Sequence, residues 1–229
     1  MARREKKNRE LLIVFDLDGV LVDVRRSYRR TIAEVTRAFT GETPSQREIQ
    51  ALKDEGGYND DWKLTHTLVR RRGRNVTRGD IKRLFQRIYL GKNFSGRIAD
   101  ERLMIRPGLV RALAGKAPLA VFTGRQRREA RHTLKKFGLW PYVSQMVCTG
   151  ECVPKPHPDG LQKIIRRFPT RRVIYLGDNI DDAISSRRAR AEFFAVIAYG
   201  GSKRARAKMF RRAGARAVLR SPNGISRYI

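Results

Sequence analysis

The chain has 229 residues, of which 41% are hydrophobic and 8% aromatic. This length and composition suit one medium-sized domain, or a domain with an insertion, and exclude a wholly disordered chain. The balance of 51 Lys and Arg against 22 Asp and Glu gives a formal net charge of +29. Because such a surface attracts polyanions, we expect weak, sequence-independent association with them.

The apolar runs of the sequence are too short to cross a bilayer, which requires about 20 apolar residues. The basic start, residues 1–10, is similar to the head of a signal peptide, but Asp16 and Asp18 interrupt the apolar run behind it. Cys148 and Cys152 are too few for a disulfide framework and lack the spacing of a redox pair, so we expect them to be packing residues. These features predict a cytoplasmic protein without a membrane span.

Apolar runs rich in β-branched residues recur along the chain and predict strands. They lie at residues 11–15, 119–123, 145–148, 173–176 and 194–198, with a weaker run at 217–219. Continuous apolarity is typical of parallel strands that are covered on both faces. Amphipathic stretches at 127–137, 159–168 and 182–191 predict helices between the strands. The alternation indicates an α/β fold with a Rossmann-like parallel sheet.

The segment 25–101 interrupts this alternation, because it has helical periodicity and no convincing strand. Two apolar faces recur at helical spacing, one formed by Tyr28, Ile32, Val35 and Phe39 and the other by Ile81, Leu84, Phe85, Ile88 and Tyr89. Ser45 and Glu48 have the spacing of a capping box that starts a further helix. We therefore predict a basic tail at 1–10, a core formed by 11–24 and 102–229, and an inserted helical cap at 25–101.

Polar residues follow the predicted strands at the points where these end. The segments are Asp16-Leu17-Asp18-Gly19, Thr123-Gly124-Arg125 and Gly177-Asp178-Asn179 with Asp181 and Asp182, and Lys155-Pro156-His157-Pro158 lies in a loop between two strands. Ligands of open parallel sheets bind beyond the carboxyl ends of the strands, so we expect these segments to meet at one site.

Asp16 and Asp178 come from different strands, and their carboxylates would repel each other at such a site unless a cation lay between them. Oxygen ligands favour Mg²⁺ over zinc. The alternative is that each aspartate only caps a helix, which is the commonest role of a loop aspartate. Four polar segments in this order favour the site.

The four segments, Asp-x-Asp-Gly, Thr-Gly-Arg, Lys-Pro-x-Pro and Gly-Asp-x-x-x-Asp, resemble the four motifs of the haloacid dehalogenase-like hydrolase superfamily. The insertion resembles the helical C1 cap of the subfamily that includes phosphoglycolate phosphatase-like enzymes. This resemblance implies the strand order 3-2-1-4-5 in the core. It also implies Mg²⁺-dependent hydrolysis of a small phosphorylated metabolite, a phosphate monoester, through an aspartyl-phosphate.

The same resemblance implies catalytic roles for individual residues. Asp16 would be the nucleophile, and Asp18 would be the general acid for the leaving oxygen and then the base that activates water. Lys155 would neutralise charge on the nucleophile and on the transferring group. An aspartate at position 18 favours phosphate monoesters, because the dehalogenases and phosphonate-cleaving enzymes of the superfamily lack it.

Binding roles follow from the resemblance in the same way. Thr123, Gly124 and Arg125 would bind the phosphoryl group together with Lys155. The Mg²⁺ ligands would be Asp16, the backbone carbonyl of Asp18, and Asp178, with Asn179 and Asp182 supporting them.

Three segments outside the motifs allow alternative interpretations. Residues 56–62, which begin with Gly56 and Gly57, form either a hinged loop that closes on the substrate or a turn between two helices with Trp62 packed inside. Arg25, Arg26, Arg29 and Arg30 either contact an anionic substrate or form the solvated face of a cap helix, and the second is favoured. Residues 204–216 form either a membrane-surface helix or a core helix with a basic face, and again the second is favoured.

Two rival functions are compatible with the motifs. A phosphomutase or phosphotransferase would use the same intermediate, with a hydroxyl group in place of water as the acceptor. A basic nucleic-acid-binding protein on this scaffold would account for the charge of +29. The intact motifs and the scattering of basic residues count against this second rival.

Overall fold

The computed structural model describes residues 10–197 and 202–229. The described residues divide into two compact units, one formed by 10–22, 103–197 and 202–229 and the other by 23–102. We call them the core unit and the helical unit. Residues 1–9 of the predicted basic tail lie outside the described residues. The role of the helical unit as a cap stays a prediction.

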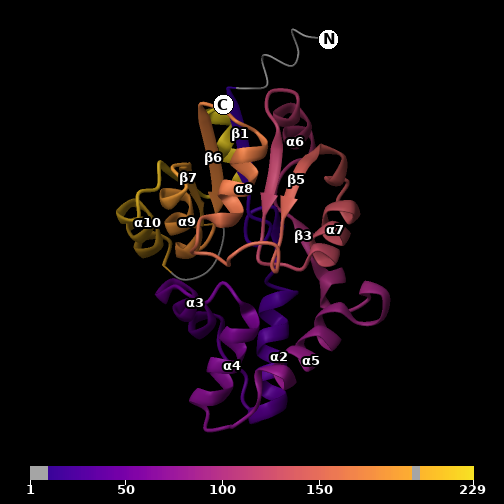
Figure 1. Cartoon of the computed structure of the whole chain (residues 1–229). Coiled ribbons are helices and arrows are strands. Elements are labelled where there is room, and N and C mark those ends of the chain that lie inside the picture. Colours follow the sequence, from indigo (N-terminus) through magenta and orange to yellow (C-terminus); the bar gives the residue numbers. More distant parts are fainter. Residues whose placement is uncertain (1–9, 198–201) are drawn as a thin grey trace. The chain divides into compact units, whose positions relative to one another are not determined.

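The core unit contains one parallel sheet, shown in Figure 1. Its strands are β1 (Leu11–Phe15), β4 (Leu119–Phe122), β5 (Val143–Val147), β6 (Arg172–Gly177), β7 (Glu192–Val196) and β8 (Ala217–Leu219). They are ordered β5-β4-β1-β6-β7-β8, and every neighbouring pair is parallel. The predicted Rossmann-like fold and the order 3-2-1-4-5 are therefore confirmed, and the weak sixth run joins the sheet as an edge strand. Ala198, the end of the fifth predicted run, lies outside the described residues.

Helices connect the strands of the core unit. They are α6 (Pro107–Ala114), α7 (Arg127–Lys136), α8 (Asp159–Arg167), α9 (Ile180–Arg188) and α10 (Lys203–Arg212), with short 3-10 helices at Trp140–Tyr142 and Pro222–Arg227. Helix α6 was not predicted, and α9 begins two residues before the predicted start because Asn179 caps it. Among the described helices, none is both long and apolar enough to cross a membrane.

The continuous apolar character of the strands follows from burial on both faces of the sheet. Leu12 and Val14 of β1 are fully buried in a cluster with Leu161 of α8 and Phe210 of α10. Successive strand residues point to opposite faces, so Ile13, which is equally buried, faces the other side. Strand β1 is therefore apolar along its whole length, and the motif residues begin where it ends.

The topology defines the place of the site within this sheet. From β1 the chain continues to β4 and β5 on one side of β1, and it later enters β6 on the other side. Such a reversal between neighbouring strands leaves a crevice beyond their carboxyl ends. Asp16 and Asp178 lie at this point, directly after β1 and β6.

The helical unit is built from α2 (Tyr28–Thr40), α3 (Gln46–Glu55), α4 (Asp61–Arg71) and α5 (Arg78–Leu90), followed by 3-10 helices at Lys92–Phe94 and Arg97–Asp100. Strands β2 (Val22–Asp23) and β3 (Arg102–Leu103) form a separate two-stranded sheet. Helices α2, α4 and α5 pack against one another. The rings of Tyr28 and Tyr89 stack at 4.1 Å between α2 and α5, in agreement with the predicted apolar faces.

The structure bears on two alternatives that the sequence left open for the helical unit. For residues 56–62, closure on the substrate stays a prediction, since Trp62 is only partly buried. Helix α3 ends at Glu55, and the Asp60 carboxylate accepts the backbone N–H groups of Trp62 and Lys63 at the start of α4, so residues 56–60 form a turn between helices. The favoured interpretation of the arginines as a solvated face is wrong for Arg29. This side chain is buried and donates a hydrogen bond to Gln50, because it lies on the inner face of α2.

Candidate active site

The loop after β1 brings two aspartates from different strands together. The backbone N–H of Asp16 donates to the carbonyl of Leu176 at 2.8 Å, which ties the end of β1 to the end of β6. Gly19 has a φ of +72°, and a Cβ atom there would lie 2.0 Å from Oδ2 of Asp178. Only glycine fits this position, since the carboxylate of Asp178 occupies the space that a side chain would need.

Asp16, Asp178 and Asp182 form a cluster in which one carboxylate oxygen of each lies within 4.8 Å of the others. Burial raises the pKa of the Asp16 carboxyl well above its ordinary value, Lys155 opposes the shift, and the neighbouring carboxylates add to it. A divalent cation would offset this repulsion, and the donor set is all oxygen, as Mg²⁺ prefers. The residues present therefore fit Mg²⁺.

Lys155 contacts two members of the cluster and is almost completely buried. Its ammonium group is 3.1 Å from Oδ1 of Asp16 and 2.7 Å from Oδ1 of Asp182. It also lies 4.6 Å from the ring centre of Phe122 and 5.5 Å from that of Tyr175, which adds cation–π attraction. Burial alone would lower the pKa of Lys155, but the two carboxylates outweigh it and raise this pKa, so the lysine stays charged.

Asp182 is held from several sides. Its Oδ1 accepts the hydroxyl of Tyr175 at 2.8 Å, and its Oδ2 accepts the backbone N–H groups of Asp178 and Asn179, each at 3.1 Å. Asn179 and Asp182 together form the capping box of α9. Asp182 thus caps α9 and at the same time contacts Lys155, because this helix begins at the site. Its supporting role for a metal stays a prediction.

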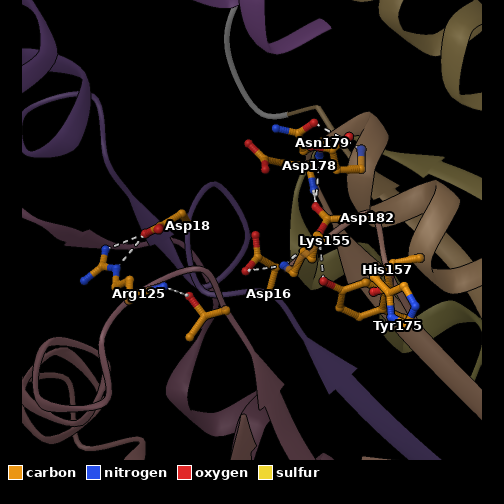
Figure 2. A network of polar contacts seen from close by, with 12 residues as sticks. Asp16, Asp18, Arg125, Lys155, His157, Tyr175, Asp178, Asn179 and Asp182 are labelled. Atoms are coloured by element: carbon orange, nitrogen blue, oxygen red, sulfur yellow. Dashed lines mark hydrogen bonds and ion pairs between the residues drawn. The ribbon is translucent and has the colours of Figure 1, made fainter. Parts of the chain in front are cut away.

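The second motif lies on the other side of Asp16, as Figure 2 shows. Thr123 is buried after β4, and its hydroxyl oxygen accepts the backbone N–H of Arg125 at 3.2 Å. Gly124 is exposed, so its backbone is accessible to a ligand. The buried guanidinium of Arg125 donates to Oδ1 of Asp18. The side chain of Asp18 is 28% exposed.

The sequence analysis missed two residues of the site, Tyr175 and Arg206. Tyr175 lies within an otherwise apolar strand, where the need of a buried hydroxyl for a partner could have indicated its contact with Asp182. Arg206 of α10 is buried and donates to the backbone carbonyl of Asp178 at 2.7 Å. Nothing in the local sequence distinguishes it from the basic residues around it.

The remaining residues with reactive side chains lie outside the cluster. His157 is exposed, and its Nδ1 accepts the backbone N–H of Asp159 at 3.2 Å. Cys148 is buried and Cys152 is half-buried, and neither forms a disulfide. Burial raises the pKa of the Cys148 thiol to about 12, so it stays protonated and inert, as a packing residue would.

Comparison with known proteins identifies the family. Imidazoleglycerol-phosphate dehydratase of Phytophthora nicotianae is 30% identical over 194 residues, which are 81% of this chain but only 43% of that protein. Phosphoglycolate phosphatase of Rhodobacter capsulatus is 25% identical over 187 residues, 79% of this chain and 81% of that protein. The crystal structure of a predicted phosphoglycolate phosphatase from Haemophilus somnus 129PT has a TM-score of 0.76 at 20% identity, covers 97% of this chain and 98% of its own, and so shows the same fold. Residues 11–190 match the haloacid dehalogenase-like hydrolase model, and the chain belongs to this family.

Proposed function

We propose that the protein is a Mg²⁺-dependent phosphatase that hydrolyses a small phosphate monoester through an aspartyl-phosphate on Asp16. The observation that carries this proposal is the position of Asp16. Its buried carboxylate lies at the reversal point of the sheet, bound to Lys155 and close to Asp178. The phosphatase of Rhodobacter capsulatus, which matches most of this chain, supports the same class of reaction.

In the first step, a carboxylate oxygen of Asp16 attacks phosphorus and the ester P–O bond breaks. Asp18 gives its proton to the leaving alkoxide, so that an alcohol departs. Thr123 accepts a backbone N–H through its hydroxyl oxygen, which leaves the hydroxyl proton for a phosphoryl oxygen. Gly124 is exposed, and its backbone N–H would be a second donor for the same group.

In the second step, Asp18 takes a proton from water, and the resulting hydroxide attacks the phosphorus of the aspartyl-phosphate. Inorganic phosphate leaves, and the Asp16 carboxylate is restored. Lys155 holds Asp16 in place throughout, since its second contact with Asp182 fixes the ammonium group. Two easier displacements thus replace one difficult hydrolysis.

Mg²⁺ would be held by Asp16, the backbone carbonyl of Asp18, and Asp178. When bound, it supplies positive charge that offsets the repulsion between the anionic nucleophile and the phosphoryl group. Asp182 accepts hydrogen bonds from Tyr175 and from two backbone N–H groups, so it is better suited to orient Asp178 than to bind the ion itself.

A screen of phosphorylated metabolites with Mg²⁺, read as released inorganic phosphate, tests the proposal. Phosphoglycolate and imidazoleglycerol phosphate belong in the screen because of the names of the two relatives. The Asp16→Asn variant is the negative control. Transfer of the phosphoryl group to a sugar hydroxyl, with no phosphate release, would favour the phosphotransferase alternative.

A second role, weak binding of polyanions, is supported by the surface of α10. This helix exposes Lys203, Arg204, Lys208, Arg211 and Arg212. From residue 193 to the end of the sequence there is no acidic side chain to offset them. We propose contacts with phosphate groups of the polyanion rather than recognition of a base sequence.

A further inference from the structure

Asp18 and Arg125 form an ion pair that the four-motif resemblance does not predict. Nε of Arg125 donates to Oδ1 of Asp18 at 2.8 Å, and Nη2 donates to the same oxygen at 2.5 Å. The Arg125 side chain is only 1% exposed. Figure 2 shows the Asp18 carboxylate directed at this guanidinium, while the Asp16 carboxylate is directed at Lys155.

Arg125 is itself fixed at several points. Its Nη1 donates to the hydroxyl of Thr133 on α7 at 2.8 Å. Its backbone N–H donates to Thr123, and its carbonyl accepts the N–H of Thr149 at 3.0 Å. Because these contacts fix the position of the guanidinium, it can in turn fix the orientation of the carboxylate that it binds.

Two buried cations of the site bind different carboxylates. Lys155 binds Asp16 and Asp182, and Arg125 binds Asp18. Without Arg125, Asp18 would lose its own cation and could turn toward the Asp16–Lys155 pair, only two residues away along the chain.

We infer that Arg125 is a positioning residue for Asp18 and does not bind the phosphate of the substrate. This inference rests on the proposed function and changes the role expected for Arg125 from the sequence. Rotation of a carboxylate about its Cβ–Cγ bond is soft unless hydrogen bonds restrict it. Because Nε and Nη2 of Arg125 both donate to Oδ1, the pair fixes the direction of the carboxylate and leaves Oδ2 for proton transfer.

With p-nitrophenyl phosphate as the substrate, loss of the position of Asp18 should affect the two chemical steps differently. Its leaving group departs without a proton, so the first step does not need Asp18. The second step still needs Asp18 as the base. A variant that loses only the position of Asp18 should therefore form the aspartyl-phosphate at a near-normal rate and hydrolyse it slowly.

The test compares Arg125→Met with Arg127→Met by stopped-flow kinetics on p-nitrophenyl phosphate with Mg²⁺. Arg127 is the matched control, because it lies two residues away, is half exposed and pairs with Glu151 rather than with Asp18. For Arg125→Met we expect a burst of one p-nitrophenolate per enzyme, followed by turnover slowed about 10- to 100-fold, with a lowered KM and a kcat/KM close to that of the wild type, because only the second step is slowed. Arg127→Met should behave as the wild type.

Rescue distinguishes positioning from a general structural effect. We expect guanidinium chloride at millimolar concentration, but not an equal concentration of NaCl, to restore part of the second step in Arg125→Ala. Arg125→Lys should lie between the wild type and Arg125→Met, since an ammonium keeps the charge without the fork. Asp18 is partly exposed and can be hydrated when the arginine is lost, so these variants should fold.

Other outcomes would overturn the inference. A tenfold rise in KM and in the inhibition constant of inorganic phosphate, with an unchanged second step, would make Arg125 a substrate ligand. A burst amplitude well below one per enzyme, without rescue, would leave only a structural role. Absence of turnover in the wild type on every phosphate ester would reject the proposed function and this inference with it. If the wild type is active but Arg125→Met gives one of the contrary results above, only the inference is rejected.

Discussion

The ammonium group of Lys155 lies 2.7 Å from Oδ1 of Asp182, and both side chains are almost completely shielded from solvent. This pair joins the loop after β5 to the first turn of α9. Asp182 also holds the two backbone N–H groups that precede α9, one of which belongs to Asp178. Because Lys155 also contacts Asp16, this buried ion pair connects the proposed nucleophile, Asp16, to the proposed metal ligand Asp178.

Replacement of Lys155 by Met should lower both the rate and the stability. The change leaves Asp182 buried without its cation, which costs about 3 kcal/mol in the free energy of unfolding. The double variant Lys155→Met/Asp182→Asn should recover part of this stability without recovering the rate. Urea unfolding and phosphate release measure the two effects, and wild-type turnover in Lys155→Met would remove the lysine from the mechanism.

The Asp16→Asn variant should lose phosphate release by about 10³-fold or more while it keeps its fold. The amide is a poor nucleophile and a poor metal ligand. Lys155 keeps its contact with Asp182 in this variant, so we expect a circular dichroism spectrum like that of the wild type. Mass spectrometry after acid quench should show a phosphorylated wild-type chain and no phosphate on the variant. Near-normal turnover would contradict the covalent mechanism.

Metal removal should abolish activity, and Mg²⁺ should restore it. EDTA treatment followed by addition of Mg²⁺ or Zn²⁺ makes this measurement, and recovery with Zn²⁺ alone would count against an all-oxygen site. Mg²⁺ should also raise the unfolding temperature of the wild type, because a ligand that binds only the folded state stabilises it. Asp178→Asn should lose this shift, whereas Asp159→Asn, a control in the same unit, should retain it.

The stability of the helical unit should depend on pH through Glu48. A hydrogen bond from Arg72 holds the pKa of Glu48 below its ordinary value. The folded state therefore favours the ionised form, so the stabilisation is present above about pH 4.3, the usual pKa of glutamate, and is lost as the pH falls through the lowered pKa. Because Glu48 is 32% exposed, the contribution is at most about 1 kcal/mol.

Urea unfolding of Glu48→Gln tests this dependence. At pH 7 the variant should be less stable than the wild type by about 0.5 to 1 kcal/mol. At a pH low enough to protonate Glu48 in the folded state, the two proteins should be equally stable. A difference that persists unchanged at low pH would show that the ion pair with Arg72 is not its cause.

Polyanion binding should be weak, independent of base sequence and separable from catalysis. For duplex DNA, log affinity should fall with log salt at a slope of about −0.9 per phosphate contact. Asp16→Asn should bind as the wild type does, because the site contributes little to the potential of the whole surface. Fluorescence anisotropy with unrelated duplexes across a salt series measures both. Strong preference for one sequence with a shallow salt slope would favour the nucleic-acid-binding rival.

Two charge-neutralised variants would locate the binding surface. One replaces the five exposed basic residues of α10 by Gln, and the other replaces Arg37, Arg47, Arg70, Arg74 and Arg87, which are exposed in the helical unit. We expect the α10 variant to lose more affinity, since its part of the sequence has no acidic residues. Equal losses would show that only the total charge matters.

The strands and the polar residues that follow them could be predicted from the amino-acid sequence alone. Parallel strands buried on both faces must be continuously apolar, so runs such as 11–15 and 173–176 and the aspartates after them are visible without a structure. Three of the four polar segments follow strand ends, and the carboxyl ends of parallel strands meet at one edge of a sheet. The convergence of the segments could therefore also be predicted. Helix α6 was missed because it is short and lies outside this pattern.

Which carboxylate pairs with which buried cation could not be predicted, because this pairing depends on contacts between segments far apart in the chain. A sequence shows that Asp18 and Arg125 are both near strand ends, but the pairing of this carboxylate with that guanidinium depends on how β1 and β4 lie side by side. The burial of Arg29 and Arg206 was hidden likewise, since in both helices the basic residues surround the position that faces inward. Helical period tells which residues share a face, whereas the identity of the polar group that meets a buried arginine is set by contacts between segments far apart in the chain.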